Sequence, residues 1–251
     1  MYLVHNLDDI KDSFFLSGRN VGASKKLCGN IAVISCLIKY DCLDFMPGTK
    51  DDYFNALHQA LRWLEGQAKR YNVTLKLEGY HIDIDAPKNF DEDRSWTIIK
   101  DYFHSSTMES LQTKYETQFN LDETPFLAVF DKHGRSFAWM QRKALPYSVD
   151  ELSVISRYKD NFDWRTIAHE LLHQFGAVDL YYPQKIQQLA DYHLGNSIMG
   201  ESMQDLDDLT AYLIGWKDTI SYDTYRFLKD TMWYTKSEFE KALAEVWKEE
   251  F

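Results

Sequence analysis

Apolar residues recur along the first third of the chain at two spacings, which predict strands and helices in turn. Residues 31–38 are apolar on both alternating faces, so they predict a strand buried on both sides. Apolar side chains then recur at intervals of three and four over residues 54–71, which predicts an amphipathic helix. Residues 73–78 alternate as a half-buried strand. This order predicts parallel strands joined by a right-handed crossover.

The middle of the chain predicts further strands of the same sheet. Residues 126–130 and 136–140 are apolar segments on either side of a turn that contains Gly134, a pattern typical of a β-hairpin. Residues 152–158 predict the last strand. One or two helices are expected over residues 95–118, and we interpret them as an insertion.

A short amphipathic helix follows the last predicted strand. Asp163 suits its N-cap, and Gly176 suits the position just after its end, where glycine adopts positive φ and turns the chain. The apolar stripe of this helix has the spacing of a core-facing side. The stripe consists of Trp164, Ile167, Ala168, Leu171, Leu172 and Phe175. His169 and His173 fall at its border, so the helix is expected to hold two imidazoles at the edge of the core.

Helical patterns dominate the C-terminal part of the chain. Residues 206–214 and a segment that begins near residue 235 carry apolar residues at helical spacing. No internal repeat, low-complexity tract or clear linker interrupts the chain. We therefore expect a single domain over residues 1–251, with an N-terminal lobe of sheet and helices over 1–176 and a mostly helical C-terminal lobe over 177–251.

Composition and charge narrow the class of partner. The 251 residues are 45% hydrophobic and 15% aromatic, which is typical of a globular protein with a substantial core. The 39 acidic and 28 basic residues give a net charge of −11, which argues against nucleic acid and anionic membranes as partners. No apolar run is long enough to span a bilayer. The sequence leaves the oligomeric state open, with a monomer as the expectation.

The start of the chain and the cysteine count bear on the compartment. The first 15 residues, MYLVHNLDDIKDSFF, lack the basic and apolar regions of an export signal. The three cysteines cannot all pair with one another and fit a reducing environment. These features predict a cytoplasmic location, or a secreted one if a leader has been removed from the chain.

Candidate chemistry is concentrated in the helix that follows Asp163. His169 and His173 are four residues apart, so both imidazoles lie on one helix face at the spacing of metal ligands. Glu170 lies beside them, where a carboxylate can accept a proton from a water molecule without binding the metal. With Gly176 and a later His or Asp required as well, such a pattern is expected in about one of ten thousand shuffled sequences.

A third ligand is expected after the turn at Gly176. This turn brings Asp179 back toward His169, and an aspartate oxygen is a suitable ligand for zinc. His193 and Glu201 are rivals for the same role, Glu201 by its resemblance to the gluzincins, in which a downstream helix donates a glutamate.

These residues resemble a known family. The pattern H-E-x-x-H-x-x-G-x-x-H/D of the metzincin metallopeptidases is matched by His169, Glu170, His173, Gly176 and Asp179. Asp in the last place is similar to the snapalysin-type variant. Residues 196–200, Asn-Ser-Ile-Met-Gly, resemble the Met-turn, in which Met199 would lie beneath the metal.

The resemblance implies a fold, a cofactor and an activity. The fold is of the α+β zincin type: a twisted mixed sheet with an antiparallel edge strand and an active-site helix, followed by a mostly helical lobe. In that family the edge strand pairs with an extended substrate, and residues 136–140 are the equivalent here. The cofactor is one catalytic Zn²⁺ held by His169, His173 and Asp179, with Met199 and Gly176 in structural roles.

The implied function is that of a zinc-dependent endopeptidase acting on a peptide or protein. Bound zinc lowers the pKa of water from 15.7 to about 7, and Glu170 serves as the general base. Glu201 stands where astacin-like members carry a tyrosine, so Tyr181, Tyr182 and His193 are candidates to stabilise the oxyanion. The alternatives are a degenerate fold that keeps metal for structure or binds a protein, and hydrolysis of a non-peptide amide.

Overall fold

The computed structural model describes residues 2–39, 44–87, 90, 94–139, 151–158, 160–201 and 203–249, with side chains described as far as residue 242. Within this part of the chain it shows a mixed α/β protein with eight α-helices. The strands are β1 Leu3–Val4, β2 Gly29–Lys39, β3 Leu75–Asp85, β4 Phe126–His133, β5 Phe137–Trp139, β6 Leu152–Arg157 and β7 Ile220–Ser221. The helices are α1 Thr49–Arg70, α2 Ser95–Tyr102, α3 Met108–Phe119, α4 Trp164–Gln174, α5 Gln184–His193, α6 Asp208–Leu213, α7 Tyr222–Asp230 and α8 Lys236–Glu249, and a 3₁₀ turn, η1, covers Phe14–Gly18.

The main sheet has five strands in the order β3-β2-β4-β6-β5. Strand β2 pairs in parallel with β3 on one side and with β4 on the other. The predicted strand over residues 31–38 and its parallel partner are therefore confirmed. Only β5 runs antiparallel to its neighbour, and it forms one edge of the sheet.

The predicted hairpin between residues 126–130 and 136–140 is wrong. Strand β6 lies between β4 and β5, so Ser153 pairs with Leu127 on one side and with Ala138 on the other. The reason is burial: every residue of β6 is buried and needs neighbours on both edges, whereas β5 is only partly buried and tolerates an edge. The last residue of the predicted hairpin, Met140, lies outside the described residues.

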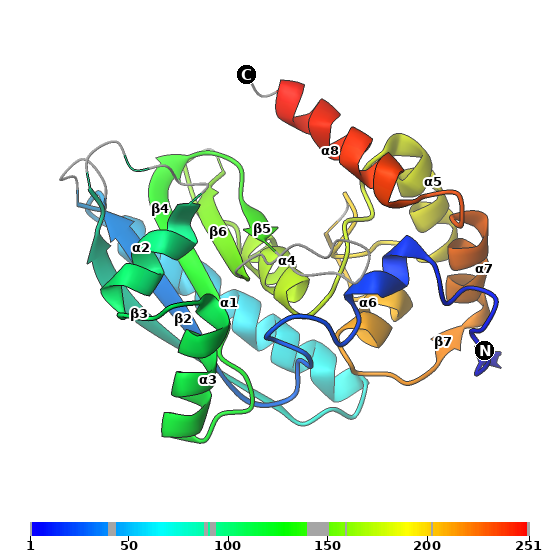
Figure 1. Ribbon diagram of the computed structural model, residues 1–251, viewed down its shortest axis with the longest axis horizontal. Coiled ribbons are helices and arrows are strands. Elements are labelled where there is room, and N and C mark those ends of the chain that lie inside the picture. The colour runs from blue at the N-terminus through cyan, green and yellow to red at the C-terminus, as the bar shows by residue number, and fades with distance from the viewer. Residues whose placement is uncertain are drawn as a thin grey trace.

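Alternate residues of β2 face two separate cores. Ile31, Val33 and Leu37 point to one core, which they share with α1 and α4. Ala32, Ile34 and Cys36 point to the other, which is closed by residues of α2 and α3. Figure 1 shows helices on both sides of the sheet, with α1 and α4 on the side toward the C-terminal helices.

The helices expected as an insertion belong to the framework of the sheet. Helices α2 and α3 connect β3 to β4, which both run parallel to β2, so this connection is a crossover. Ile99 of α2 and Leu111 of α3 are fully buried against the second face of the sheet. This packing covers the apolar face that β2, β4 and β6 would otherwise expose to water.

Helix α4 is fixed to the sheet by buried polar side chains. Gln174 donates from Nε2 to the backbone oxygen of Phe126 (3.0 Å) and to Oγ of Ser153 (2.8 Å). Ser153 in turn donates to the backbone oxygen of Glu170 (2.7 Å). Buried groups of this kind are costly to leave unpaired, so these bonds set the position of α4 against β4 and β6.

The C-terminal region from residue 177 onward is largely helical, with α5, α6, α7 and α8 to the right of the sheet in Figure 1. The start of the chain joins this region, because β1 pairs with β7 through Leu3 and Ser221. The division into lobes at residue 176 stays a prediction. Among the described helices, none combines the length and apolar character needed to cross a bilayer.

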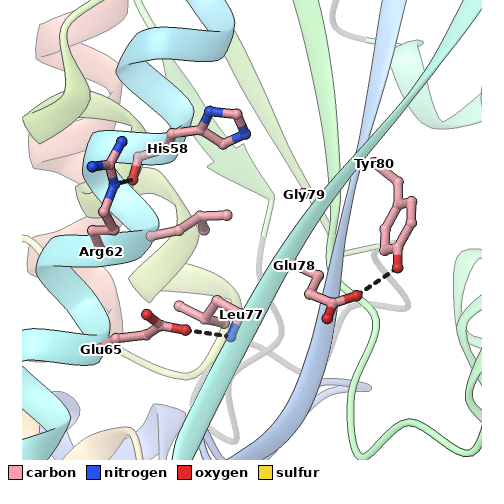
Figure 2. Close-up of a pocket in the computed structure, with 8 residues that line it drawn as sticks. His58, Arg62, Glu65, Leu77, Glu78, Gly79 and Tyr80 are labelled. Atoms are coloured by element: carbon pink, nitrogen blue, oxygen red, sulfur yellow. Dashed lines mark hydrogen bonds between the residues drawn. The ribbon is translucent and has the colours of Figure 1, made fainter.

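The free edge of β3 borders a surface pocket of about 390 Å³ next to α1 (Figure 2). Glu65 of α1 accepts the backbone N–H of Leu77 (2.9 Å), and Arg62 donates to the backbone oxygen of His58 (3.3 Å). Some of the polar groups that line the pocket are therefore already hydrogen-bonded within the protein. The pocket lies at the sheet edge opposite to β5, and is therefore separate from the site built on α4.

Candidate metal centre

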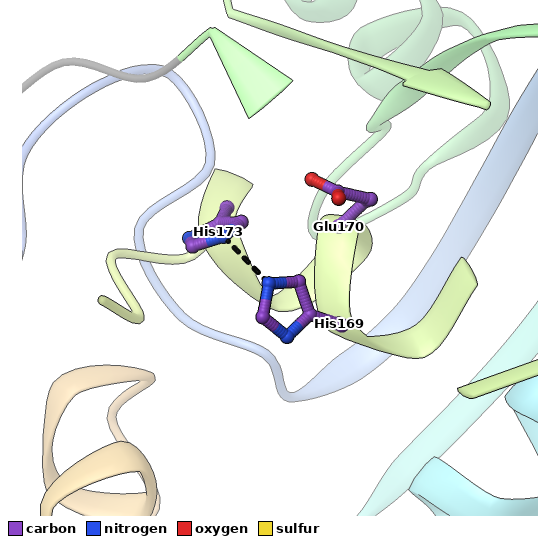
Figure 3. A group of neighbouring side chains, drawn as sticks. All are labelled: His169, Glu170 and His173. Atoms are coloured by element: carbon purple, nitrogen blue, oxygen red, sulfur yellow. Dashed lines mark hydrogen bonds between the residues drawn. The ribbon is translucent and has the colours of Figure 1, made fainter. Parts of the chain in front are cut away.

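Helix α4 holds its two histidines at the border of the core. Its N-cap is Asp163, whose carboxylate accepts the backbone N–H of Arg165 (3.1 Å), and Gly176 with φ of 96° turns the chain after the last helical residue. Both predicted ends are therefore confirmed. His169 and His173 are 4% and 3% exposed and lie one turn apart with their ring nitrogens facing each other (Figure 3).

Three donor atoms meet in a small triangle. The Nε2 atoms of His169 and His173 are 3.1 Å apart, and Oδ1 of Asp179 lies 3.0 Å and 3.1 Å from them, respectively. A tetrahedral site with metal–ligand distances of about 2.0–2.2 Å separates neighbouring ligand atoms by about 3.3–3.6 Å. A small outward shift of the triangle would therefore admit a zinc-sized ion.

The other ring nitrogens fix the tautomers of both histidines. Nδ1 of His169 donates to the backbone oxygen of Ile198 (2.9 Å), and Nδ1 of His173 donates to that of Ala177 (3.1 Å). Carbonyl oxygens only accept, so the proton of each neutral ring is on Nδ1 and the lone pair is on Nε2. Metal-binding histidines have this arrangement of outer hydrogen bonds. The triangle thus consists of three electron-pair donors that require a proton or a cation between them.

The electrostatics of the site favour positive charge. Burial lowers the pKa of His169, but the Asp179 carboxylate, the Glu170 charge and the Ile198 carbonyl together raise it to about 9. Burial raises the pKa of Asp179, yet the two imidazoles hold it well below its usual value. Both shifts have the same direction: the site favours positive charge between these side chains, which suits a divalent cation.

Glu170 lies beside the triangle, with one carboxylate oxygen that forms no hydrogen bond among the described residues. Its side chain is 5% exposed, and its Oε2 has no hydrogen-bond partner among the described residues. Burial raises its pKa. One ligand-type atom each from His169, Glu170 and His173 fall within 4.8 Å of one another, so this group could hold a metal ion (Figure 3). A buried carboxylate oxygen that is not bonded within the described residues is available to a water molecule at this position.

Residues 197–200 form a turn that contacts both ligand segments. The backbone N–H of Gly200 donates to the oxygen of Ser197 (3.0 Å), and Met199 is fully buried. The oxygen of Ile198 accepts from His169, and the oxygen of Met199 accepts the backbone N–H of Leu180, the residue after Asp179 (2.8 Å). The 197–200 turn therefore fixes α4 and the segment of Asp179 relative to each other. The place of Met199 beneath a metal stays a prediction.

The two rival ligands, His193 and Glu201, have other partners. His193 pairs with Asp230 (3.1 Å), and the Glu201 carboxylate is exposed and accepts from Gln187. Neither contact involves the donor triangle, so the structure brings Asp179 and not these residues to the histidines.

Of the oxyanion candidates, Tyr181 lies next to His169. Its ring centroid is 6.1 Å from that of His169, and its hydroxyl accepts from Nη2 of Arg135 (3.1 Å). Arg135 was not predicted from the sequence. Arg135 lies just after β4, and Asp179 and Tyr181 follow it by 44 and 46 positions in the sequence. No short-range spacing predicts a contact over such a separation. Its positive charge acts on both Tyr181 and Glu170.

Comparison with known proteins adds no family assignment: no family model matches the sequence, and no curated protein is similar to it. The fold and the site define a mixed α/β protein with a buried His-Glu-His group on one helix that could hold a metal ion.

Proposed function

We propose that this chain is a zinc-dependent endopeptidase with a metzincin-like fold. The observation that carries the proposal is the triangle of His169 Nε2, His173 Nε2 and Asp179 Oδ1, with sides of 3.0–3.1 Å and with both Nδ1 atoms committed to backbone carbonyls. Two nitrogens and one carboxylate oxygen are a donor set that zinc prefers.

The same donor set favours a catalytic site over a structural one. Structural zinc sites are closed by four protein ligands, whereas catalytic sites keep one position for water or substrate. Here the third donor, Asp179, has a side chain that is 37% exposed, although both histidines are buried. The centre is thus reached from the side of Asp179, which supports a role in chemistry.

Residues of the chain account for the proton transfers. A zinc ion in this position supplies a lowered water pKa and polarisation of a substrate carbonyl. Glu170 accepts the proton of the attacking water on its free Oε2 and donates it to the leaving amine. Burial raises the pKa of Glu170, which makes its carboxylate a stronger base toward the proton of the water.

Tyr181 supplies the second contact to the substrate oxygen. Its hydroxyl accepts from Arg135, so its own proton is directed elsewhere, and its ring borders that of His169. A donor of this kind stabilises the charge that develops on the carbonyl oxygen during attack.

The substrate is a peptide or protein bound in extended form. Strand β5 is the antiparallel edge of the sheet and has no partner strand on its outer side among the described residues, so a peptide backbone can add there. The net charge of −11 argues against nucleic acid as the substrate. We expect the protein to act as a monomer.

The test is metal analysis together with hydrolysis of an unstructured protein such as casein. We expect one zinc per chain and measurable cleavage. Glu170→Gln is expected to keep the zinc and to lose activity about 10²–10⁴-fold. Glu201→Gln is the matched control, because this exposed carboxylate bonds only Gln187 among the described residues, and it should retain both zinc and activity. Zinc without cleavage of casein or of a broad peptide library would favour a structural metal site.

A further inference from the structure

The 197–200 turn is itself held by a buried carboxylate from another element. Oγ of Ser197 donates to Oδ2 of Asp207 (2.5 Å) and accepts the backbone N–H of Met199 (3.0 Å). Ser197 and Asp207 are 2% and 6% exposed. The hydroxyl of Ser197 therefore has one donor and one acceptor partner, both buried, which fixes its orientation.

The carboxylate of Asp207 is held in place because Asp207 is the N-cap of α6. Its Oδ1 accepts the backbone N–H of Thr210 (2.9 Å), and its Oδ2 accepts the hydroxyl of Thr210 (2.5 Å). A capping carboxylate with these bonds cannot rotate without losing them. The turn is also paired at its base, where the N–H of Ile198 donates to the oxygen of Asp205 (2.6 Å).

The connection continues from the turn to the donor triangle. Ser197 holds the N–H of Met199, the preceding carbonyl of Ile198 accepts from Nδ1 of His169, and the Met199 carbonyl accepts from Leu180 beside Asp179. The buried pair of Ser197 and Asp207 therefore supports the hydrogen bonds that orient His169 and the segment of Asp179.

We propose that Asp207 and Ser197 are positioning residues of the metal centre, which set its zinc affinity by fixing the 197–200 turn beneath His169 and Asp179. The proposal rests on the proposed zinc-binding function. Groups that orient metal ligands through one intermediate contribute about 10–100-fold to metal affinity. Neither residue contributes an atom to the donor triangle.

The test compares two buried serines. Ser197→Ala is expected to lower zinc affinity about 10–100-fold in competition with a chelator. Ser221→Ala is the matched control, because Ser221 is 5% exposed and its hydroxyl caps α7 by accepting the N–H of Thr224 (3.1 Å), and not an N–H of the 197–200 turn. It should lose similar thermal stability and keep the wild-type zinc affinity. Cobalt substitution gives a second readout, since a displaced His169 changes the visible absorption spectrum.

A cycle with Asp207→Asn tests whether the pair acts as a unit. Asparagine places an NH₂ group where the hydroxyls of Ser197 and Thr210 need an acceptor, so the single variant should lose as much zinc affinity as Ser197→Ala, and the double variant no more than either. Wild-type affinity in Ser197→Ala, or an equal loss in Ser221→Ala, overturns the positioning role alone. A wild-type chain that binds no zinc overturns the proposed function as well.

Discussion

Gly18 and Gly176 lie backbone to backbone, so neither has room for a side chain. A Cβ on Gly18 would lie 2.6 Å from the oxygen of Gly176, and a Cβ on Gly176 would lie 2.5 Å from the oxygen of Gly18. Gly18 ends η1, and Gly176 with φ of 96° forms the turn between His173 and Asp179. The N-terminal segment therefore packs directly on the turn that carries the third donor to the histidines.

We expect Gly18→Ala to destabilise the fold by about 1–3 kcal/mol, because the new methyl group meets backbone that cannot yield without a shift. The shift displaces the Gly176 turn, so zinc affinity should fall as well. Urea unfolding and chelator competition measure the two effects.

Gly66→Ala is the control for this prediction. Gly66 is within α1 and a Cβ there meets nothing within 4 Å, so alanine should stabilise the helix by about 0.5–1 kcal/mol. Unchanged stability and zinc affinity in Gly18→Ala would contradict the contact between η1 and the turn.

The metal-free protein should lose stability as the pH rises from 6.5 to 9. The pKa of His169 is raised to about 9 in the folded chain, against about 6.5 when unfolded. The protonated histidine therefore contributes its full stabilisation of the fold below pH 6.5, and this stabilisation is lost as the pH rises through about 9. The loss is of the order of 3 kcal/mol. Urea unfolding with a chelator at several pH values measures it.

Asp179→Asn is the control for this pH dependence. It removes the carboxylate that contacts Nε2 of His169 at 3.0 Å, so the slope between these pH values should become shallower. A slope that stays unchanged would show that Asp179 does not hold the proton on the histidine. The zinc-loaded protein should behave in the opposite way, because protons compete with the metal for the same atoms.

Tyr181→Phe should lower kcat about 10²-fold and leave KM and zinc affinity unchanged, because the hydroxyl is required only when charge develops on the substrate oxygen. Arg135→Gln should give a smaller loss, since it removes the group that donates to this hydroxyl and leaves the tyrosine in place. Steady-state kinetics with one fluorogenic peptide gives kcat and KM of both variants, and zinc titration shows whether their metal affinity has changed. Equal activity of Tyr181→Phe and wild type would remove Tyr181 from the mechanism.

Gln174→Leu should cost about 1–3 kcal/mol, because it leaves the backbone oxygen of Phe126 buried and without its amide donor. The measurement is the free energy of unfolding in urea. Gln187→Leu, at a polar side chain of α5 that bonds exposed Glu201, should change stability much less. A similar cost for both variants would mean that Gln174 does not anchor α4 to the sheet.

The periodicity of neighbouring residues predicted much of the fold and the two histidines of the site. The alternation of 31–38 predicted β2 with a core on each face, and the spacing of His169 and His173 placed two imidazoles on one side of α4. Asp163 and Gly176 marked the helix ends correctly. These features depend on neighbours within a few residues, so the sequence by itself carries them.

Contacts between distant segments were decided only by the tertiary structure. Strand β6 lies between β4 and β5 because a fully buried strand needs a partner on both edges, and no short-range pattern encodes that order. The approach of Arg135 to Tyr181 and the bond from Asp207 to Ser197 likewise depend on how separate elements pack. Helix and strand periods are properties of a few consecutive residues, whereas strand order and the second contacts of a site follow from which apolar faces must be buried together.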